Sequence, residues 1–198
     1  MVVATTSGES DIVKPMNVVF DDIDGVEWAT VAIHTLADKN IINGKEPRKF
    51  SPNDAVTREE FVKILIGAMK LSESEYNGNS FVDVSDSDWF LSYVNIANEK
   101  GIVRGIGNSM FGTGSKITRQ DMAVMLYNAL KFKNVEVAAV ELPFADENQI
   151  AEYAKEAVSV LYKMGAVNGI SDTEFAPKGT ATRAQAAKII YEVLDYLG

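Results

Sequence analysis

The sequence comprises 198 residues, of which 46% are hydrophobic, so it can bury a core and is not of the disordered class. Its 28 acidic residues outnumber 19 basic residues, and the formal charge of −9 argues against broad electrostatic binding to nucleic acid or to an anionic membrane surface. Because the chain has no cysteine, it can form no disulfide, thiolate metal site or cysteine nucleophile.

The first 19 residues are polar, with scattered valine and threonine, and are expected to form an extended leader. They lack the basic start and the apolar stretch of a signal peptide. The longest apolar runs, such as Met122 to Tyr127, are too short to cross a bilayer, so no membrane insertion is expected.

Three blocks of the sequence then repeat the same internal spacing. Each begins with a phenylalanine and acidic residues, followed by an aromatic residue, a glycine 16 residues later, a phenylalanine 6 residues further on and a Thr-Arg pair. In chain order these are Trp28, Trp89 and Tyr153, then Gly44, Gly105 and Gly169, then Phe50, Phe111 and Phe175, then Arg58, Arg119 and Arg183. The fixed spacing predicts three structural units, at 20–71, 81–132 and 144–197, joined by links of variable length.

The aromatic residue of each block opens a segment with helical spacing of its apolar residues. The predicted first helices span Trp28 to Lys39, about Asp88 to Lys100 and about Ile150 to Met164. The Asn-Gly or Arg-Gly pair that follows is expected to supply a residue of positive φ for a turn.

The Thr-Arg pair of each block opens a second helix with the spacing of a capping box. The threonines Thr57, Thr118 and Thr182 are followed three residues later by Glu60, Asp121 and Gln185, of which Asp and Gln should close the box less well or without charge. Apolar residues then recur at offsets 0, 3, 4, 7 and 8 in every copy. The predicted fold class is therefore mainly α, with helix–loop–helix units that share a core in pseudo-threefold symmetry or stack as a short solenoid.

An arginine in the first turn of a helix calls for a reason, because the helix N-terminus carries partial positive charge. Arg58, Arg119 and Arg183 all stand at this position. Beside free N–H groups, such an arginine could bind a carboxylate or phosphate of a ligand. The alternative is an ion pair with the acidic cluster before each first helix, through Asp22 or Asp24, Asp86 or Asp88, and Asp146 or Glu147.

The aromatic residues at the start of the first helices allow two interpretations. They could stack on the apolar face of a sugar, or they could be wedges in the core, which their spacing alone favours. Other chemistry has weak support: the DIDG segment at 22–25 matches only the start of a calcium-binding loop, and His34 is the single histidine. No metal, cofactor or catalytic residue is predicted.

These blocks, F-x-D, W, G-I-V-x-G, F-x-P and T-R-x-E, together resemble the S-layer homology domain in three tandem copies, from Phe20 to about Leu197. The resemblance implies a pseudo-threefold trimer with a central bundle of the first helices, and grooves that bind a secondary cell-wall polymer, often with pyruvate ketals on N-acetylmannosamine. It assigns ligand contacts to the arginines and aromatic residues above and to the loop glycines Gly44, Gly105 and Gly169. Copy three departs from the pattern at Tyr153, Ala166 and Gln185, which puts its part in binding in doubt.

The resemblance also implies a function without catalysis. The chain is expected to be an extracellular module that attaches a larger surface protein or S-layer lattice non-covalently to an anionic polysaccharide of a bacterial, Gram-positive cell wall. The alternative is a protein-interaction scaffold with an apolar groove. A glycosidase would need two carboxylates at a fixed separation across a cleft, whereas the acidic residues here follow helix caps.

Overall fold

The computed structural model describes residues 18–71 and 79–198, so the leader expected at residues 1–19 and the link expected at residues 72–80 lie largely outside the described residues. Within the described ranges the chain is helical, with isolated β-bridges and no sheet. In chain order the elements are α1 (Glu27–Asp38), α2 (Arg58–Ala68), α3 (Leu91–Glu99), α4 (Arg119–Phe132), η1 (Glu147–Gln149), η2 (Glu152–Ala154), α5 (Lys155–Lys163), α6 (Arg183–Glu192) and α7 (Leu194–Leu197).

The predicted first helices are present in all three copies, but two are shorter than expected. The helix α1 agrees with the prediction to within one residue, whereas α3 begins three residues after Asp88. In copy three the backbone is extended at Ile150 and Ala151, and this separates the 3₁₀ turns η1 and η2 from each other ahead of α5. The apolar pattern therefore locates each helix but not its first turn.

The predicted second helices begin where the capping threonines place them. Thr57 and Glu60 form the complete reciprocal box, as do Thr182 and Gln185. In copy two the Thr118 side chain caps the backbone N–H of Asp121, but the aspartate accepts from the threonine hydroxyl rather than from its backbone. The expected weakness of the Asp version is confirmed, because its side chain is one carbon shorter than that of glutamate.

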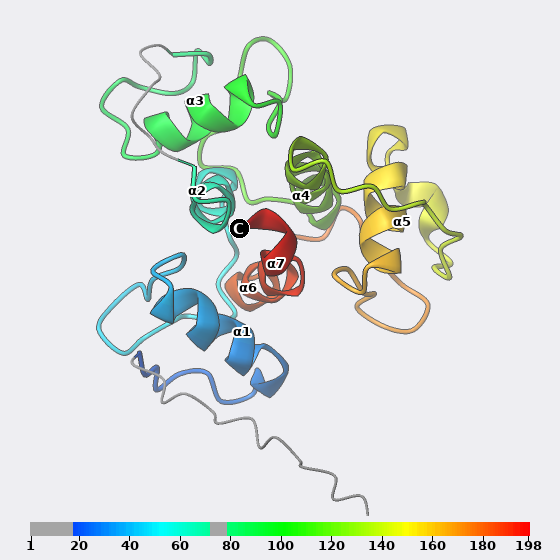
Figure 1. Ribbon diagram of the computed structural model, residues 1–198, viewed down its shortest axis with the longest axis horizontal. Helices are drawn as coiled ribbons and strands as arrows, with labels where there is room; N and C mark the ends of the chain where they lie inside the picture. Colours follow the sequence, from blue (N-terminus) through cyan, green and yellow to red (C-terminus); the bar gives the residue numbers. More distant parts are fainter. Residues whose placement is uncertain (1–17, 72–78) are drawn as a thin grey trace, which may run out of the picture.

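Figure 1 shows α2, α4 and α6 around the centre of the molecule, with α1, α3 and α5 outside them. The helix α3 packs on α2 and α5 packs on α4, while α1, from the first copy, packs on α6 from the last copy. The implied central bundle of first helices is therefore wrong, since the second helices occupy that place. Their burial explains why: eight of the eleven residues of α2 are buried, whereas Trp28 and Val31 expose one side of α1 to solvent.

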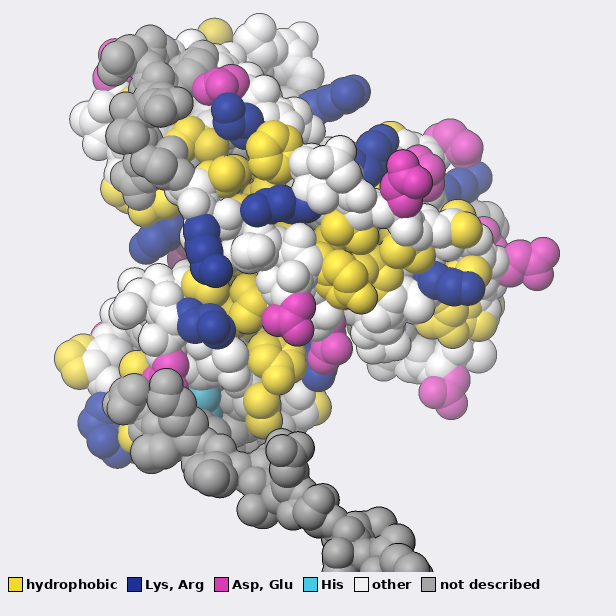
Figure 2. Space-filling model, in the orientation of Figure 1, with side chains coloured by type: hydrophobic (Ala, Val, Ile, Leu, Met, Phe, Trp, Pro, Cys, Tyr) yellow, Lys and Arg dark blue, Asp and Glu magenta, His cyan; other side chains and the backbone are white. Residues whose placement is uncertain are grey.

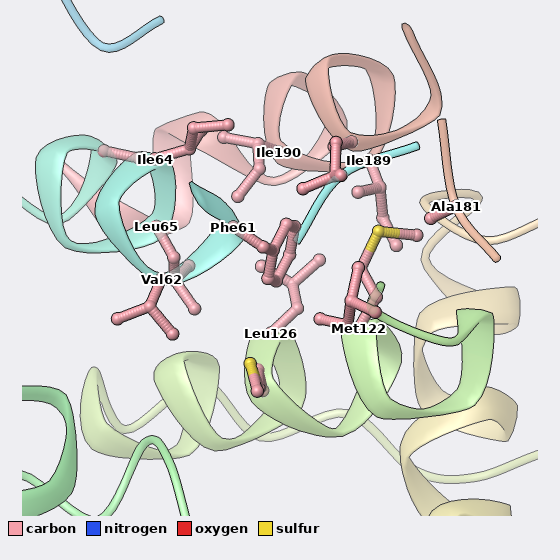
Figure 3. Close-up of a cluster of buried hydrophobic side chains, with 14 of the residues drawn as sticks. Phe61, Val62, Ile64, Leu65, Met122, Leu126, Ala181, Ile189 and Ile190 are labelled. Carbon is pink, nitrogen blue, oxygen red and sulfur yellow. The ribbon is translucent and has the colours of Figure 1, made fainter. Parts of the chain in front are cut away.

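The core joins the three central helices directly. Figure 3 shows Phe61 and Leu65 of α2, Leu126 of α4 and Ile189 and Ile190 of α6 gathered in one cluster. All five side chains are buried, and Phe61 and Leu65 have no exposed surface. Since no copy could bury this apolar surface alone, the three units depend on one another for stability.

A ring of three backbone hydrogen bonds joins the segments that precede α2, α4 and α6. The N–H of Val56 donates to the carbonyl oxygen of Ala181 (3.0 Å), that of Ala181 to Ile117 (3.1 Å), and that of Ile117 to Val56 (2.9 Å). Each copy therefore donates to one neighbour and accepts from the other, so the chain of three units closes on itself.

Candidate functional site

The three arginines of the Thr-Arg pairs are buried between copies. Their side chains are 5–8% exposed, and each guanidinium lies over the phenylalanine ring of another copy, 4.7–5.2 Å from the ring centroid. The Nε atoms of Arg58, Arg119 and Arg183 donate to the carbonyl oxygens of Phe111, Phe175 and Phe50, and their Nη2 atoms donate to those of Arg104, Asn168 and Asn43. The arginines thus connect copy one to two, two to three, and three to one.

These contacts leave one nitrogen of each guanidinium without a hydrogen bond. Within residues 18–71 and 79–198, Nη1 of these three arginines forms no hydrogen bond. Every fully buried side-chain nitrogen or oxygen in these ranges does have a hydrogen-bond partner. The three Nη1 atoms are therefore not fully buried and retain accessible surface. Burial lowers the pKa of each arginine. The negative charge of nearby carboxylates opposes this shift, and the largest such effect comes from Asp121 on Arg58, from Asp146 on Arg119 and from Glu60 on Arg183. An arginine nonetheless stays protonated at neutral pH.

The expected free N–H groups beside the arginines are absent at α4 and α6. At α6 the backbone N–H groups of Arg183 and Ala184 donate to carbonyl oxygens of Asp54 and Pro52, and the threonine cap takes the next one. At α4 the N–H groups of Arg119 and Gln120 donate to Gly179 and Pro177 in the same way. Any anion contact must therefore come from the side chains, and the predicted helix N-terminal anion site is wrong at these two helices.

The acidic residues before the first helices bind backbone rather than arginine. The carboxylates of Asp22, Asp83 and Asp146 accept hydrogen bonds of 2.6–3.0 Å from the N–H groups of the loop that begins at the phenylalanine of the same copy. The alternative ion pair between the Thr-Arg arginines and these acidic clusters is therefore not formed by the described residues. In copy two the carboxylate that holds the loop is that of Asp83, which the F-x-D motif marks, and not that of Asp86 or Asp88, which were expected.

The bonds to Asp83 also determine its charge. Burial alone would raise the pKa of this carboxyl, but the N–H groups of Phe111, Thr113 and Gly112 lower it below its ordinary value. Asp83 is therefore ionised at neutral pH and holds the loop through charge-assisted bonds.

The aromatic residues at the start of the first helices lie on the surface. Trp28 is 52% exposed, Trp89 57% and Tyr153 63%. The interpretation as core wedges, which their spacing favoured, is therefore wrong. Figure 2 shows that hydrophobic side chains also gather elsewhere on one face of the molecule, beside lysine and arginine side chains.

Each of these rings lines a pocket with an arginine from a second copy and a loop from the third. In the Arg58 pocket, of about 560 Å³, Arg58 of copy one faces Tyr153 of copy three, and the wall consists of α4 and the Gly105 loop of copy two. In the Arg119 pocket, of about 430 Å³, Arg119 of copy two meets Trp28 of copy one beside α6 and the Gly169 loop.

The third pocket repeats this composition with the copies exchanged once more. In the Arg183 pocket, of about 230 Å³, Arg183 of copy three meets Trp89 of copy two beside α2 and the Gly44 loop of copy one. The structure thus brings all nine candidate residues into three pockets, each of which needs all three copies.

The loop glycines line the pockets but do not have the expected positive φ. That conformation occurs earlier, at Asn40, Gly101 and Gly165, immediately after the first helices. Gly44 and Gly105 are instead required by close packing: a Cβ at Gly44 would lie 2.7 Å from the carbonyl oxygen of Lys49 and 2.8 Å from the ring of Phe20. Their role is therefore to let the loop fold tightly against the first phenylalanine of the copy.

Tyr153 belongs to a hydrogen-bond network in the Arg58 pocket. Its hydroxyl donates to Asp121 (2.8 Å) and accepts from the Gln120 side chain (3.1 Å). The same carboxylate of Asp121 lies 4.0 Å from Nη1 of Arg58. Tyrosine thus has a partner that the tryptophans Trp28 and Trp89 cannot engage in the same manner, since the indole has only a donor.

We expect Tyr153 to ionise later than an ordinary tyrosine. Burial of its hydroxyl, the hydrogen bond to Asp121 and the charge of that residue raise its pKa to about 12. Because the folded pKa exceeds the unfolded value of about 10, its contribution to stability is full below about pH 10 and is lost as the pH rises towards 12. The test is a pH titration of tyrosinate absorbance in the native protein and in Tyr153→Phe. The difference between the two curves should show a transition near pH 12. A transition near pH 10 would contradict the hydrogen-bond network.

The described residues offer little for other chemistry. Residues 18–71 and 79–198 contain no group of three or more His, Cys, Asp or Glu placed to hold a metal ion. No helix in these ranges combines the length and the apolar character needed to span a membrane.

Comparison with known proteins identifies the repeat. The S-layer homology domain matches at residues 19–62, 80–123 and 143–187, which together make up more than half of the chain. The chain belongs to the S-layer homology domain family. Three tandem copies are therefore confirmed, and each arginine and aromatic position lies within one of the three matched ranges.

Similar proteins carry names of different kinds. The chain is 36% identical over 96% of its length to the exoglucanase XynX of Acetivibrio thermocellus, and 34% identical over 90% to an amylopullulanase of Thermoanaerobacterium thermosulfurigenes. It is 26% identical over 96% to an S-layer protein of Bacillus thuringiensis subsp. finitimus. The chain spans 17%, 10% and 23% of these relatives, respectively.

Proposed function

We propose that this chain is a non-enzymatic module that attaches a larger protein to the bacterial cell wall by binding an anionic secondary cell-wall polysaccharide. The observation that carries the proposal is the repeated pocket, in which an exposed aromatic ring lies near a buried arginine. An aromatic ring offers a platform for the apolar face of a sugar, and a guanidinium offers charge-assisted hydrogen bonds to a carboxylate.

The relatives support attachment rather than catalysis. An exoglucanase, an amylopullulanase and an S-layer protein have unlike names, yet each matches this chain over a quarter of its length or less. A segment shared by such proteins is better explained by a common location than by a common reaction. We therefore place this chain at the cell surface of a Gram-positive bacterium, in a larger surface protein or S-layer lattice.

We further propose that the three copies form a pseudo-threefold unit with three polysaccharide sites. The ring of backbone bonds through Val56, Ala181 and Ile117 and the cyclic order of the arginine contacts support this arrangement. In each pocket the aromatic ring and the arginine Nη1 would contact the ligand. The glycines would allow the loop to pack closely against the first phenylalanine of the copy, which leaves room for the ligand. A pyruvate ketal on N-acetylmannosamine would supply the carboxylate.

Removal of both indole rings is expected to weaken the binding of purified wall polysaccharide about fivefold at each of the two pockets that they line, since each ring stacks on a sugar with an energy of about 1 kcal/mol. The variant Trp28→Ala/Trp89→Ala should fold normally because both side chains are more than half exposed. Co-sedimentation with cell-wall sacculi measures the affinity. The matched control, Val31→Ala/Val82→Ala, truncates two apolar side chains that are also more than half exposed but line none of the three pockets, and should bind normally.

Undiminished binding by the double tryptophan variant would contradict the proposed sites. Calorimetry with a pyruvylated disaccharide, before and after removal of the ketal, then tests the role of the carboxylate. Equal affinity for both sugars would contradict the contact with arginine, and indifference to any saccharide would favour the protein-interaction scaffold.

A further inference from the structure

The three pockets share one architecture but differ in their carboxylates. The Arg119 pocket is lined by the cationic side chains of Arg119 and Lys188 and by no carboxylate of the described residues. The other two pockets contain both signs of charge: Asp121 and Glu156 beside Arg58, Arg104 and Lys131 in one, and Glu60 beside Arg183, Lys45 and Lys63 in the other. An acidic ligand would therefore meet a negative group in two pockets but not in the third.

The surroundings of Arg119 point in the same direction. Asp146 is the one described carboxylate whose charge acts appreciably on Arg119, and its two oxygens already accept from the N–H groups of Phe175 and Ala176. Carboxylates acting on the other two arginines are more numerous: Asp121, Glu59 and Asp83 on Arg58, and Glu60, Asp54 and Asp22 on Arg183. Fewer carboxylates therefore act on Arg119 than on either of the other two arginines.

The difference originates at the capping-box position of the second helix. Glu60, Asp121 and Gln185 are equivalent residues, and each lines the pocket beside its own helix. Gln185 closes the capping box through its Oε1 atom, which accepts from the N–H of Thr182 at 3.1 Å, just as Glu60 accepts from Thr57 at 3.0 Å. The glutamine therefore preserves the cap and removes one negative charge from the pocket.

We infer that Gln185 strengthens the binding of an acidic saccharide in the Arg119 pocket, because it forms the cap without the carboxylate that stands at this position in the other two pockets. The inference depends on the proposed function, because it concerns one of the sites that the proposal introduces. It reverses the expectation from the resemblance, in which the departure at Gln185 put the binding role of copy three in doubt.

The chain contains a separate reporter for two of the pockets. Its two tryptophans line different sites, Trp28 the Arg119 pocket and Trp89 the Arg183 pocket. Their indole N–H signals in a ¹H–¹⁵N NMR spectrum, assigned with Trp89→Phe, can be followed during titration with a pyruvylated N-acetylmannosamine disaccharide. We expect both signals to shift in a saturable manner, so that the half-saturation concentration of each reports the affinity of its own pocket. One unit charge close to the ligand changes the affinity about tenfold at a partly solvated site.

Gln185→Glu should raise the half-saturation concentration at Trp28 about tenfold and leave that at Trp89 unchanged. The converse variant, Glu60→Gln, should lower the value at Trp89 and leave Trp28 unchanged. Both substitutions exchange residues that already form the cap in this chain, so both variants should fold with the thermal stability of the parent.

Unchanged titration at Trp28 in Gln185→Glu, with normal binding by the parent chain, would overturn the inference and leave the proposed function intact. The same holds if Glu60→Gln leaves the titration at Trp89 unchanged. If neither indole responds to the disaccharide, the proposed function fails together with the inference. An equal response to the disaccharide without its ketal would overturn the electrostatic explanation.

Discussion

Gly44→Ala is expected to destabilise the folded protein by about 3 kcal/mol or more, in the absence of any ligand. The added methyl group would lie 2.7 Å from the carbonyl oxygen of Lys49, 2.8 Å from the Phe20 ring and 2.9 Å from the carbonyl oxygen of Glu46. Two of these obstacles are backbone atoms, and Phe20 is buried, so none can move aside without disturbing the packing of the loop. Urea denaturation followed by circular dichroism measures the change.

The same substitution at Gly67 provides a matched control with the opposite sign. Gly67 lies within α2, and the nearest atoms to an added Cβ belong to Ile41, at 3.9 Å. Because alanine favours a helix over glycine, Gly67→Ala should stabilise the protein by about 0.5–1 kcal/mol. A small effect of Gly44→Ala would show that the loop is not held by this close approach, and would return Gly44 to a role in ligand contact alone.

Arg183→Met is expected to cost about 3 kcal/mol of stability, because it removes two hydrogen bonds that close the ring of copies. Nε donates to the carbonyl oxygen of Phe50 at 2.9 Å and Nη2 donates to that of Asn43 at 2.6 Å, and the side chain is 5% exposed. Loss of the donor leaves buried acceptors without a partner. Arg183→Lys should recover only part of the loss, since an ammonium group cannot reproduce the planar fork of the guanidinium.

Hydrogen exchange locates this effect in the structure. Because Arg183 joins the last copy to the first, its replacement should accelerate exchange in α1, which packs on α6, more than in α3 or α5. The control is Arg48→Met, which removes an exposed arginine paired with Asp21 and should change stability much less than Arg183→Met does. An equal loss of stability in Arg183→Met and Arg48→Met would contradict a specific role of Arg183 in joining the last copy to the first. Uniform acceleration of hydrogen exchange across the helices would do the same.

The structural role of the arginines affects how binding experiments are interpreted. Loss of wall binding in an Arg183 variant would not by itself establish a ligand contact, because the same side chain supports the pocket wall through Asn43 and Phe50. Exposed residues such as Trp28, and cap-preserving exchanges such as Gln185→Glu, separate binding from folding. They are therefore the stronger tests of the proposed sites.

Features that depend on residues close together in the chain could be predicted from the sequence. The repeat spacing located three units, the apolar periodicity located the helices, and the threonines Thr57, Thr118 and Thr182 located the second-helix N-termini. A capping box is complete within four residues, so its geometry follows from the local sequence. The arginines and aromatic residues of the pockets were also named, because they recur in one register, whereas the loop glycines came from the family resemblance and other lining residues such as Lys188 and Glu156 were not foreseen.

How these parts face one another depends on contacts between residues far apart in the chain. Arg183 and its acceptor Phe50 are 133 residues apart, and nothing in the local pattern indicates that they meet. The same reason explains the errors: whether Trp28 is core or surface depends on which helix α1 packs against, and the use of Gly44 depends on a phenylalanine 24 residues earlier. Pairing between copies is non-local, so periodicity shows which side of a helix is apolar but not which helix covers it.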